Sequence, residues 1–294
     1  MIYNYDYVPQ PPQAWPFPHP VQPNFPTASW PFASAPWASE QEYDMREREQ
    51  PLTFVLIHGA WADASFWAGV AAELRKKGHT VYVPEYPGHG ADPNKKVTHA
   101  MLSKSIADYI ISHNLHNIIL VGHSFGGSLV QKVAELVPDR LRRLVFLNAF
   151  VLKDGERVAD EFPPPVIAVF EQLRKSTKDD TIMLPFPLYR ETFANLGSME
   201  QVRMMYKKVS PEPAAPSFEK LDLKKFYSLT VPKSYLHLTD DTALPLGNPD
   251  YGWHPHMSSR LGLYRLIQTS GDHMTTIQFE PQRIARKLYE AARD

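Results

Sequence analysis

The chain has 294 residues, with 31 Lys and Arg against 32 Asp and Glu, a formal net charge of −1 and no cysteine. The balanced charge offers no attraction to nucleic acid or acidic lipid, and no apolar run is long enough to span a bilayer. The missing cysteines exclude disulfides, Cys–His catalysis and zinc–thiolate sites, although they leave the cellular compartment open.

Residues 1–50 differ from the rest of the chain because they are dense in proline and aromatic residues, among them Trp15, Trp30 and Trp37. This much proline excludes helix and central strand and favours extended chain. A disordered tail is one interpretation, but such tails are usually poor in aromatics. The alternative is an arm that straps across its own domain, a partner subunit of a homo-oligomer, or another protein. No basic start followed by an apolar segment marks a secretory signal, so we expect a cytoplasmic protein.

The predicted folded domain, residues 51–294, opens with a buried strand at Phe54–Ile57 that runs into His58-Gly59-Ala60-Trp61. A glycine at this point lets the backbone approach a substrate, and the amide of Ala60 can point inward. A second strand at 81–84 leads into the loop Pro87-Gly88-His89-Gly90.

Between the strands lie segments with helical periodicity, at 66–77 and 100–112. Alternating strands and helices indicate βαβ units. We therefore expect an α/β domain with a mostly parallel sheet and helices on both of its faces.

The most informative motif follows these segments. A run of branched apolar residues ends in Gly122-His123-Ser124-Phe125-Gly126 and passes into a helix-like stretch from Ser128 to Leu136. A G-x-S-x-G pattern between a strand and a helix is a nucleophile elbow, where a Cβ at either glycine would collide with a neighbouring element. Ser124 is therefore the candidate nucleophile. The amides of Phe125, at the positive end of the helix, and of Ala60 would form an oxyanion hole.

The next strand is expected at Leu144–Asn148, as the fifth strand of the sheet. It precedes a segment at about 151–227 that breaks the alternation of strands and helices. This segment holds a proline triplet, helix-like pieces at 166–175 and 198–209, and many methionines and aromatic residues. We expect a helical lid whose apolar side chains form a small core of their own and partly line a pocket. Such an adaptable apolar wall favours a hydrophobic substrate, aromatic ones included.

A serine hydroxyl needs a base, and the base needs an orienting acid. A strand at 235–238 ends near Asp240 and Asp241, and a strand at 266–269 leads to His273. Both follow Ser124 in the order nucleophile, acid, base, at the carboxyl ends of strands, where an open parallel sheet gathers its site. On this reasoning either aspartate can be the acid.

These segments together resemble the α/β-hydrolase branch that holds plant hydroxynitrile lyases, plant methyl esterases of the salicylate-binding type and bacterial pyrethroid-type carboxylesterases. The resemblance runs from about Leu52 to the C-terminus, and its specific parts are residues 54–61, the elbow, 145–150 and 271–274. It implies the α/β-hydrolase fold with Ser124 as nucleophile and His273 as base. Members of the branch place the acid four residues before a proline, which selects Asp241 before Pro245, with Asp240 as the second choice.

Two positions separate lyases from esterases within this branch. The lyases carry a threonine after the histidine of the first strand's loop and a lysine after the catalytic histidine, where it stabilises departing cyanide. The matching residues here are Gly59 and Met274. A methionine supplies no positive charge, and Gly59 leaves space for a tetrahedral intermediate. Both positions favour an esterase.

We therefore predict a serine esterase that cleaves carboxylic esters of hydrophobic small molecules through an acyl-enzyme. It would need no metal or organic cofactor, and we expect no nucleic-acid or membrane partner. The alternatives are a hydroxynitrile lyase, a cofactor-free oxygenase or C–C bond hydrolase on the same fold, and a non-catalytic ligand receptor. His254 and His256 could suggest a metal, but no acidic or cysteine partner lies at ligand spacing, which favours a loop surface. We expect His58, His89 and His123 to be structural neighbours of the site.

Overall fold

The computed structural model describes residues 51–294, so the predicted N-terminal arm lies outside the described residues. Within them the main sheet has six strands in the order β2-β1-β3-β4-β7-β8, and every neighbouring pair is parallel. The strands are β1 (Thr53–Ile57), β2 (Thr80–Tyr82), β3 (Ile118–Ser124), β4 (Leu141–Ala149), β7 (Lys233–Leu238) and β8 (Arg265–Thr269). The predicted parallel α/β sheet is confirmed.

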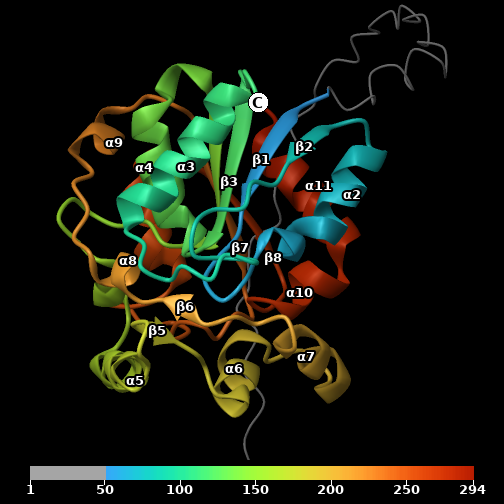
Figure 1. Ribbon diagram of the computed structural model, residues 1–294. Helices are drawn as coiled ribbons and strands as arrows, with labels where there is room; N and C mark the ends of the chain where they lie inside the picture. The colour runs from blue at the N-terminus through green and yellow to red at the C-terminus, as the bar shows by residue number, and fades with distance from the viewer. Residues whose placement is uncertain (1–50) are drawn as a thin grey trace, which may run out of the picture. The chain divides into compact units, whose positions relative to one another are not determined.

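Helices cover both faces of this sheet, so its central strands are continuous apolar runs, as in β3, where every residue is buried. Helices α3 and α4 pack together on one face, and α2 and α11 pack together on the other (Figure 1). The helices outside the stretch between β4 and β7 are η1 (Ala64–Trp67), α2 (Ala68–Lys76), α3 (His99–Ser112), α4 (Gly126–Leu136), η2 (Pro138–Arg140), η4 (Trp253–Met257), η5 (Ser258–Leu261), α10 (Thr275–Phe279) and α11 (Pro281–Ala292). The apolar residues of α11 recur at helical spacing, which turns one stripe of this helix toward the sheet.

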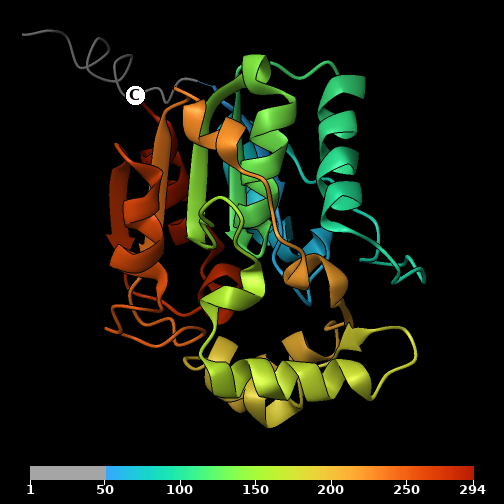
Figure 2. The ribbon, with the colours of Figure 1, turned by 90° about the vertical axis from the view of Figure 1, so that its left-hand side faces the viewer.

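Most of the chain between β4 and β7, residues 150–232 and here called the insertion, lies beyond the carboxyl ends of the strands, while its last helix, at residues 224–228, returns along α4 (Figures 1 and 2). Its elements are η3 (Val158–Glu161), α5 (Pro164–Lys175), β5 (Thr181–Ile182), α6 (Phe186–Phe193), α7 (Met199–Tyr206), β6 (Glu212–Pro213), α8 (Ala215–Phe218) and α9 (Lys224–Ser228). Strands β5 and β6 pair antiparallel as a separate small sheet. The insertion therefore places a second layer over the edge of the sheet where β3 ends.

Three details differ from the sequence predictions. The strand predicted at Leu144–Asn148 is β4, the fourth strand of the described part of the chain and not the fifth. The proline triplet does not precede α5 but starts it, because prolines in a first helical turn lack only N–H groups that have no helical partner. The β5–β6 sheet was not predicted, since two residues per strand leave no alternation to detect.

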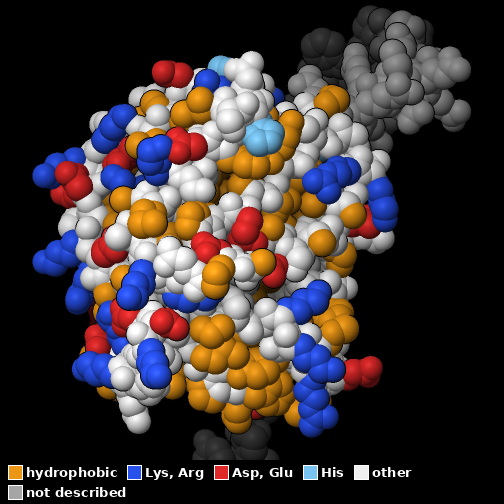
Figure 3. Space-filling view, viewed as in Figure 1, with side chains coloured by type: hydrophobic (Ala, Val, Ile, Leu, Met, Phe, Trp, Pro, Cys, Tyr) orange, Lys and Arg blue, Asp and Glu red, His pale blue; other side chains and the backbone are white. Residues whose placement is uncertain are grey.

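Some apolar side chains of the insertion face outward and do not join a core. Hydrophobic side chains gather at the lower end of the face in Figure 3, in the region of α6 in Figure 1. Leu196, Met199 and Met204 are among the exposed large apolar residues of the insertion. Only part of the predicted lid core is therefore buried.

Candidate active site

Ser124 ends β3 in the left-handed backbone region, with φ of 54°. A serine rarely adopts this conformation, and here the sharp turn from β3 into α4 requires it. The two elbow glycines make the turn possible: a Cβ at Gly122 would lie 2.6 Å from the carbonyl oxygen of Gly126, and a Cβ at Gly126 would lie 2.6 Å from that of His58. The predicted strand–turn–helix geometry of the elbow is therefore present.

His273 lies against Asp241, with Nδ1 2.6 Å from Oδ2. The Asp241 carboxylate, which is fully buried, also accepts hydrogen bonds from Nδ2 of Asn148 at 2.6 Å and from the amide of Ala243 at 2.8 Å. These donors hold the carboxylate in place beside the imidazole. Asp240 turns away and accepts the amide of Gly271 at 2.7 Å, so of the two candidate acids only Asp241 contacts the histidine.

The end of α6 holds the loops that carry this pair. The amide of Leu196 donates to Oδ2 of Asp272 at 3.0 Å, next to His273 in the chain. On the other side of His273, the amide of Met274 donates to the carbonyl oxygen of Phe193 at 2.9 Å. The insertion therefore does more than cover the site, since it also fixes the histidine loop from both sides.

Three rings enclose the imidazole of His273. Trp253, from η4, stacks on it with centroids 5.3 Å apart, and Phe193 approaches edge-on at 5.4 Å. His123 lies 4.4 Å away and stacks on Phe66. Complete burial lowers the pKa of His123 well below its usual value, so this ring is neutral and adds no competing charge beside His273.

Ser124 opens onto a pocket with about 510 Å³ of unfilled space, part of it open to solvent. Its wall includes Ala60 and Phe125, the two residues predicted to form an oxyanion hole. The aromatic residues of the wall are Trp61, Phe125, Phe150, Phe162, Phe170, Phe193, Phe218 and Trp253. A pocket of this size with a mostly apolar wall suits a small organic ligand.

The two positions that separate lyases from esterases lie in different environments. Gly59 packs directly against the elbow, and a Cβ there would be 2.7 Å from Cβ of Ser124. The site therefore accommodates no threonine at this position without moving the serine. Met274 lines a second pocket, which shares Trp61 with the pocket onto which Ser124 opens.

Polar networks surround this core. His58 contacts Glu85 through Nε2 at 2.8 Å and the Tyr86 hydroxyl through Nδ1 at 2.9 Å, while His89 contacts Glu212 at 3.0 Å. As predicted, these two histidines are structural neighbours of the site. Within residues 51–294, no group of three or more His, Cys, Asp or Glu side chains is arranged to hold a metal ion.

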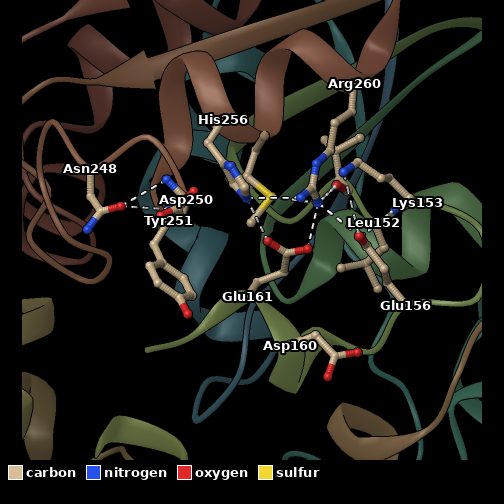
Figure 4. Close-up of polar contacts among 12 residues, drawn as sticks. Leu152, Lys153, Glu156, Asp160, Glu161, Asn248, Asp250, Tyr251, His256 and Arg260 are labelled. Atoms are coloured by element: carbon tan, nitrogen blue, oxygen red, sulfur yellow. Dashed lines mark hydrogen bonds and ion pairs between the residues drawn. The ribbon is translucent and has the colours of Figure 1, made fainter. Parts of the chain in front are cut away.

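His256 belongs to a half-buried ionic cluster between the insertion and η5. Its Nε2 lies 2.8 Å from Oε2 of Glu161, and Arg260 binds the other oxygen of Glu161 at 2.6 Å (Figure 4). Arg260 also donates to the carbonyl oxygen of Val151 and to Glu156. The prediction of a plain loop surface for His256 therefore missed an acidic partner, because Glu161 lies 95 residues away in the chain.

Sequence reasoning also missed Asn148, Trp253 and Glu212 as residues of the site. The sequence prediction includes Asn148 only as the end of a strand, although a polar residue at the carboxyl end of a parallel strand is a signal in itself. No local pattern marks the other two, which reach the site from the short helix η4 and from a two-residue strand.

The fold and the elbow at its carboxyl edge define a protein of the α/β-hydrolase class. A model of the alpha/beta hydrolase family matches residues 54–289, and the chain belongs to this family. In the described residues, no helix has the length and apolar character needed to cross a membrane.

Among solved structures, an extracellular alpha/beta-hydrolase from a Paenibacillus species is 56% identical, with a TM-score of 0.81 over 83% of this chain and 100% of that one. It is described as sharing structural and functional homology with tobacco salicylic acid binding protein 2. The predicted resemblance to the branch with salicylate-type methyl esterases is confirmed.

Two curated relatives have esterase names. A carbendazim hydrolyzing esterase from a Nocardioides species is 37% identical over 124 residues, which are 40% of this chain and 51% of that protein. The putative chloroplastic methylesterase 13 of Arabidopsis thaliana is 24% identical over 220 residues, 70% of this chain and 50% of that protein. The chain thus spans about half the length of these two relatives.

Proposed function

We propose that the protein is a serine esterase that cleaves carboxylic esters through an acyl-enzyme. The observation that carries the proposal is the 2.6 Å contact between His273 and a buried Asp241, in a chain whose elbow serine opens onto an apolar pocket. Ligand binding alone requires no such acid–imidazole pair behind a serine on a strained turn. The esterase names of the relatives support the same reaction.

In the proposed reaction His273 Nε2 takes the proton of Ser124 as Oγ attacks the ester carbonyl carbon. The negative charge that develops on the carbonyl oxygen is stabilised by the amides of Ala60 and Phe125, and Asp241 stabilises the imidazolium. The carbon–oxygen bond to the alcohol then breaks, and the alcohol leaves with the proton from His273. Water repeats the sequence on the acyl-enzyme and releases the acid.

The substrate is proposed to be an ester with a hydrophobic, aromatic or bulky aliphatic group, with the insertion acting as the lid. The aromatic wall supports this class, since apolar burial supplies most of the binding energy in such pockets. The names of the relatives refer to carbendazim and to methyl esters, which makes small aryl and methyl esters the first compounds to test.

The cellular location of the protein, the division of its chain and its oligomeric state are proposed as follows. The cytoplasmic location rests on the sequence alone, whereas the Paenibacillus relative is described as extracellular, so fractionation of the native host should assay both compartments. We also propose that the chain divides into an arm at residues 1–50 and a hydrolase body at 51–294. The arm is proposed to mediate homo-oligomerisation, which a comparison of the full-length and truncated proteins can test.

The deciding experiment is a screen of p-nitrophenyl esters of graded acyl length with the wild type and Ser124→Ala, together with a fluorophosphonate probe. We expect turnover and labelling in the wild type, and a loss of about 10³-fold or more in the alanine variant. The variant Ser65→Ala, at an exposed serine, is the matched control and should keep both. A folded Ser124→Ala protein that retains a tenth of the activity would refute the proposal.

A further inference from the structure

The loop at residues 58–64, here called the oxyanion loop, is held by two carboxylates from different parts of the chain. Glu85, in the loop after β2, accepts the amide of Ala64 at 2.8 Å and contacts His58. The second carboxylate is Glu212, which comes from β6 of the insertion and accepts the amide of Trp61 at 2.8 Å. Glu212 is only 2% exposed. A carboxylate this deeply buried is tolerated only when hydrogen bonds or opposite charges satisfy its oxygens, as the Trp61 amide does here.

Trp61 is the residue at which this loop bends. Its φ of 59° lies in the left-handed region, which a tryptophan occupies only when its surroundings stabilise it. Both of its polar hydrogens go to the small sheet of the insertion: the amide to Glu212 in β6, and the indole Nε1–H to the carbonyl oxygen of Ile182 in β5, each at 2.8 Å. The insertion thus holds the strained residue by both strands at once.

The charge of Glu212 has a partner on the body side. His89, from the loop after β2, places Nε2 3.0 and 3.1 Å from the two oxygens of Glu212, and both side chains are buried. Although burial opposes protonation of the imidazole, the Glu212 carboxylate raises the pKa of His89. A buried carboxylate paired in this way has one fixed orientation, which a solvated glutamate would lack.

We propose that Glu212 is a positioning residue for the oxyanion hole. Trp61 directly follows Ala60, so the amide that Glu212 holds belongs to one of the two peptide planes that flank Ala60. The Ala60 N–H lies in the other plane, and the two planes meet at the Ala60 Cα, so fixing the Trp61 amide restricts the direction in which the Ala60 N–H can point. The hole is therefore complete only while the β5–β6 sheet is docked on Trp61. The inference rests on the proposed function, because it takes Ala60 as an oxyanion donor.

The test compares Glu212→Ala with Glu212→Gln, whose amide oxygen can still accept the Trp61 N–H. The quantities to measure are kcat and KM on one p-nitrophenyl ester and the inhibition constant of a trifluoromethyl ketone. The tetrahedral adduct of this ketone places an oxyanion in the hole. Since misplacing one oxyanion donor costs up to about 10²-fold, we expect the alanine variant to lose about 10- to 100-fold in kcat, with a comparable loss of ketone affinity and little change in KM.

The glutamine variant should recover most of both losses. The matched control is Glu200→Ala, an exposed carboxylate in the first turn of α7 of the same insertion, which should behave as wild type. Circular dichroism and thermal melts establish that each variant is folded. Should the alanine variant not fold, Glu212→Met removes the acceptor but keeps the side-chain volume, and carries the same comparison.

Three outcomes overturn the inference alone. A folded Glu212→Ala or Glu212→Met with wild-type kcat shows that the carboxylate positions nothing. Equal losses in both the alanine and the glutamine variants, or a rise in KM with unchanged ketone affinity, would point to a collapsed pocket instead. In these cases wild-type turnover leaves the proposed function standing. A wild type that hydrolyses no ester would refute the proposed function and this inference together.

Discussion

The indole of Trp253 lies parallel to the imidazole of His273, with ring centroids 5.3 Å apart and planes inclined by 11°. In the proposed mechanism this imidazole becomes positively charged, and an aromatic face stabilises a cation by about 0.5–2 kcal/mol. We expect Trp253→Leu to lower kcat by about 2- to 30-fold, which is that energy expressed as a rate. Steady-state kinetics on one ester measure it, with Trp253→Phe as the control that keeps a ring. Equal losses in the two variants would assign the effect to pocket shape.

The neighbouring aspartates allow a test within a single loop. Asp241→Asn removes the charge beside His273 and favours the wrong imidazole tautomer, so kcat should fall by about 10⁴-fold. Asp240→Asn retains an oxygen that can accept the amide of Gly271. Its kcat should stay within about threefold of wild type, because a charged acceptor is only replaced by a neutral one. Comparable losses in the two variants would remove Asp241 from its proposed role.

Gly126 is expected to be intolerant of any side chain. Its Cβ would lie 2.6 Å from the carbonyl oxygen of His58 and 2.8 Å from that of Ile57, both backbone atoms that cannot move aside alone. Gly126→Ala should lower the free energy of unfolding by about 1–3 kcal/mol, the usual cost of overpacking. In the control Gly78→Ala the added Cβ meets open space, so stability is lowered only by placing an alanine at a positive φ. Urea melts in which the two variants are equally stable would contradict this reading.

His99 gives the fold a dependence on pH. Burial, and next the charge of Lys132, lower the pKa of His99 to about 3. Because the folded pKa lies below the unfolded one, this histidine's contribution to stability is fully present above about pH 6.5 and is lost progressively as the pH falls toward 3. One proton taken up on unfolding corresponds to a slope of about 1.4 kcal/mol per pH unit.

His99→Gln should flatten that slope, since a neutral amide does not titrate and can still reach the hydroxyl of Ser128, which His99 contacts at 3.0 Å. Urea melts of wild type and variant between pH 7 and 4 measure the difference. Parallel stability curves over this range would show that His99 titrates alike in the folded and unfolded states.

Deleting residues 1–45 tests the predicted arm. All proposed site residues lie beyond Leu52, so turnover of a small ester should persist. If the aromatics of this segment pack on the body or on a second subunit, their loss exposes apolar surface at about 25 cal/mol per Å². We then expect a lower melting temperature or a smaller mass by light scattering. An unchanged melt and an unchanged mass would favour the disordered interpretation.

The parts of the site that the sequence made predictable are those encoded over short distances. The elbow from Gly122 to Gly126 carries its own turn chemistry. The strands before Asp241 and His273 identify themselves by their apolar runs, and parallel pairing then gathers their ends at one edge of the sheet. The resemblance to a known branch was needed only to choose Asp241 over Asp240.

The remaining contacts join residues that no pattern links. Trp61 and Glu212 are 151 positions apart, and Asn148 and Asp241 are 93 apart. The first contact depends on how the insertion packs on the body, and the second on the pairing of β4 with β7, which are separated in the chain by the whole insertion. Both are tertiary results with no periodic signature. The stack of Trp253 on His273 is of the same kind, since it follows from where the chain places the short helix η4 and not from a propensity.

The insertion is fastened to the body at three places around the proposed site. Glu212 reaches the oxyanion loop, Leu196 reaches the histidine loop, and Glu161 is bound by Arg260 beside the segment that carries Trp253. In chimeras built to alter substrate preference, residues 150–232 are therefore not a module that can be exchanged alone. A graft from a relative would have to bring matched partners for Trp61, Asp272 and Arg260, or the new pocket would come with a misaligned catalytic apparatus.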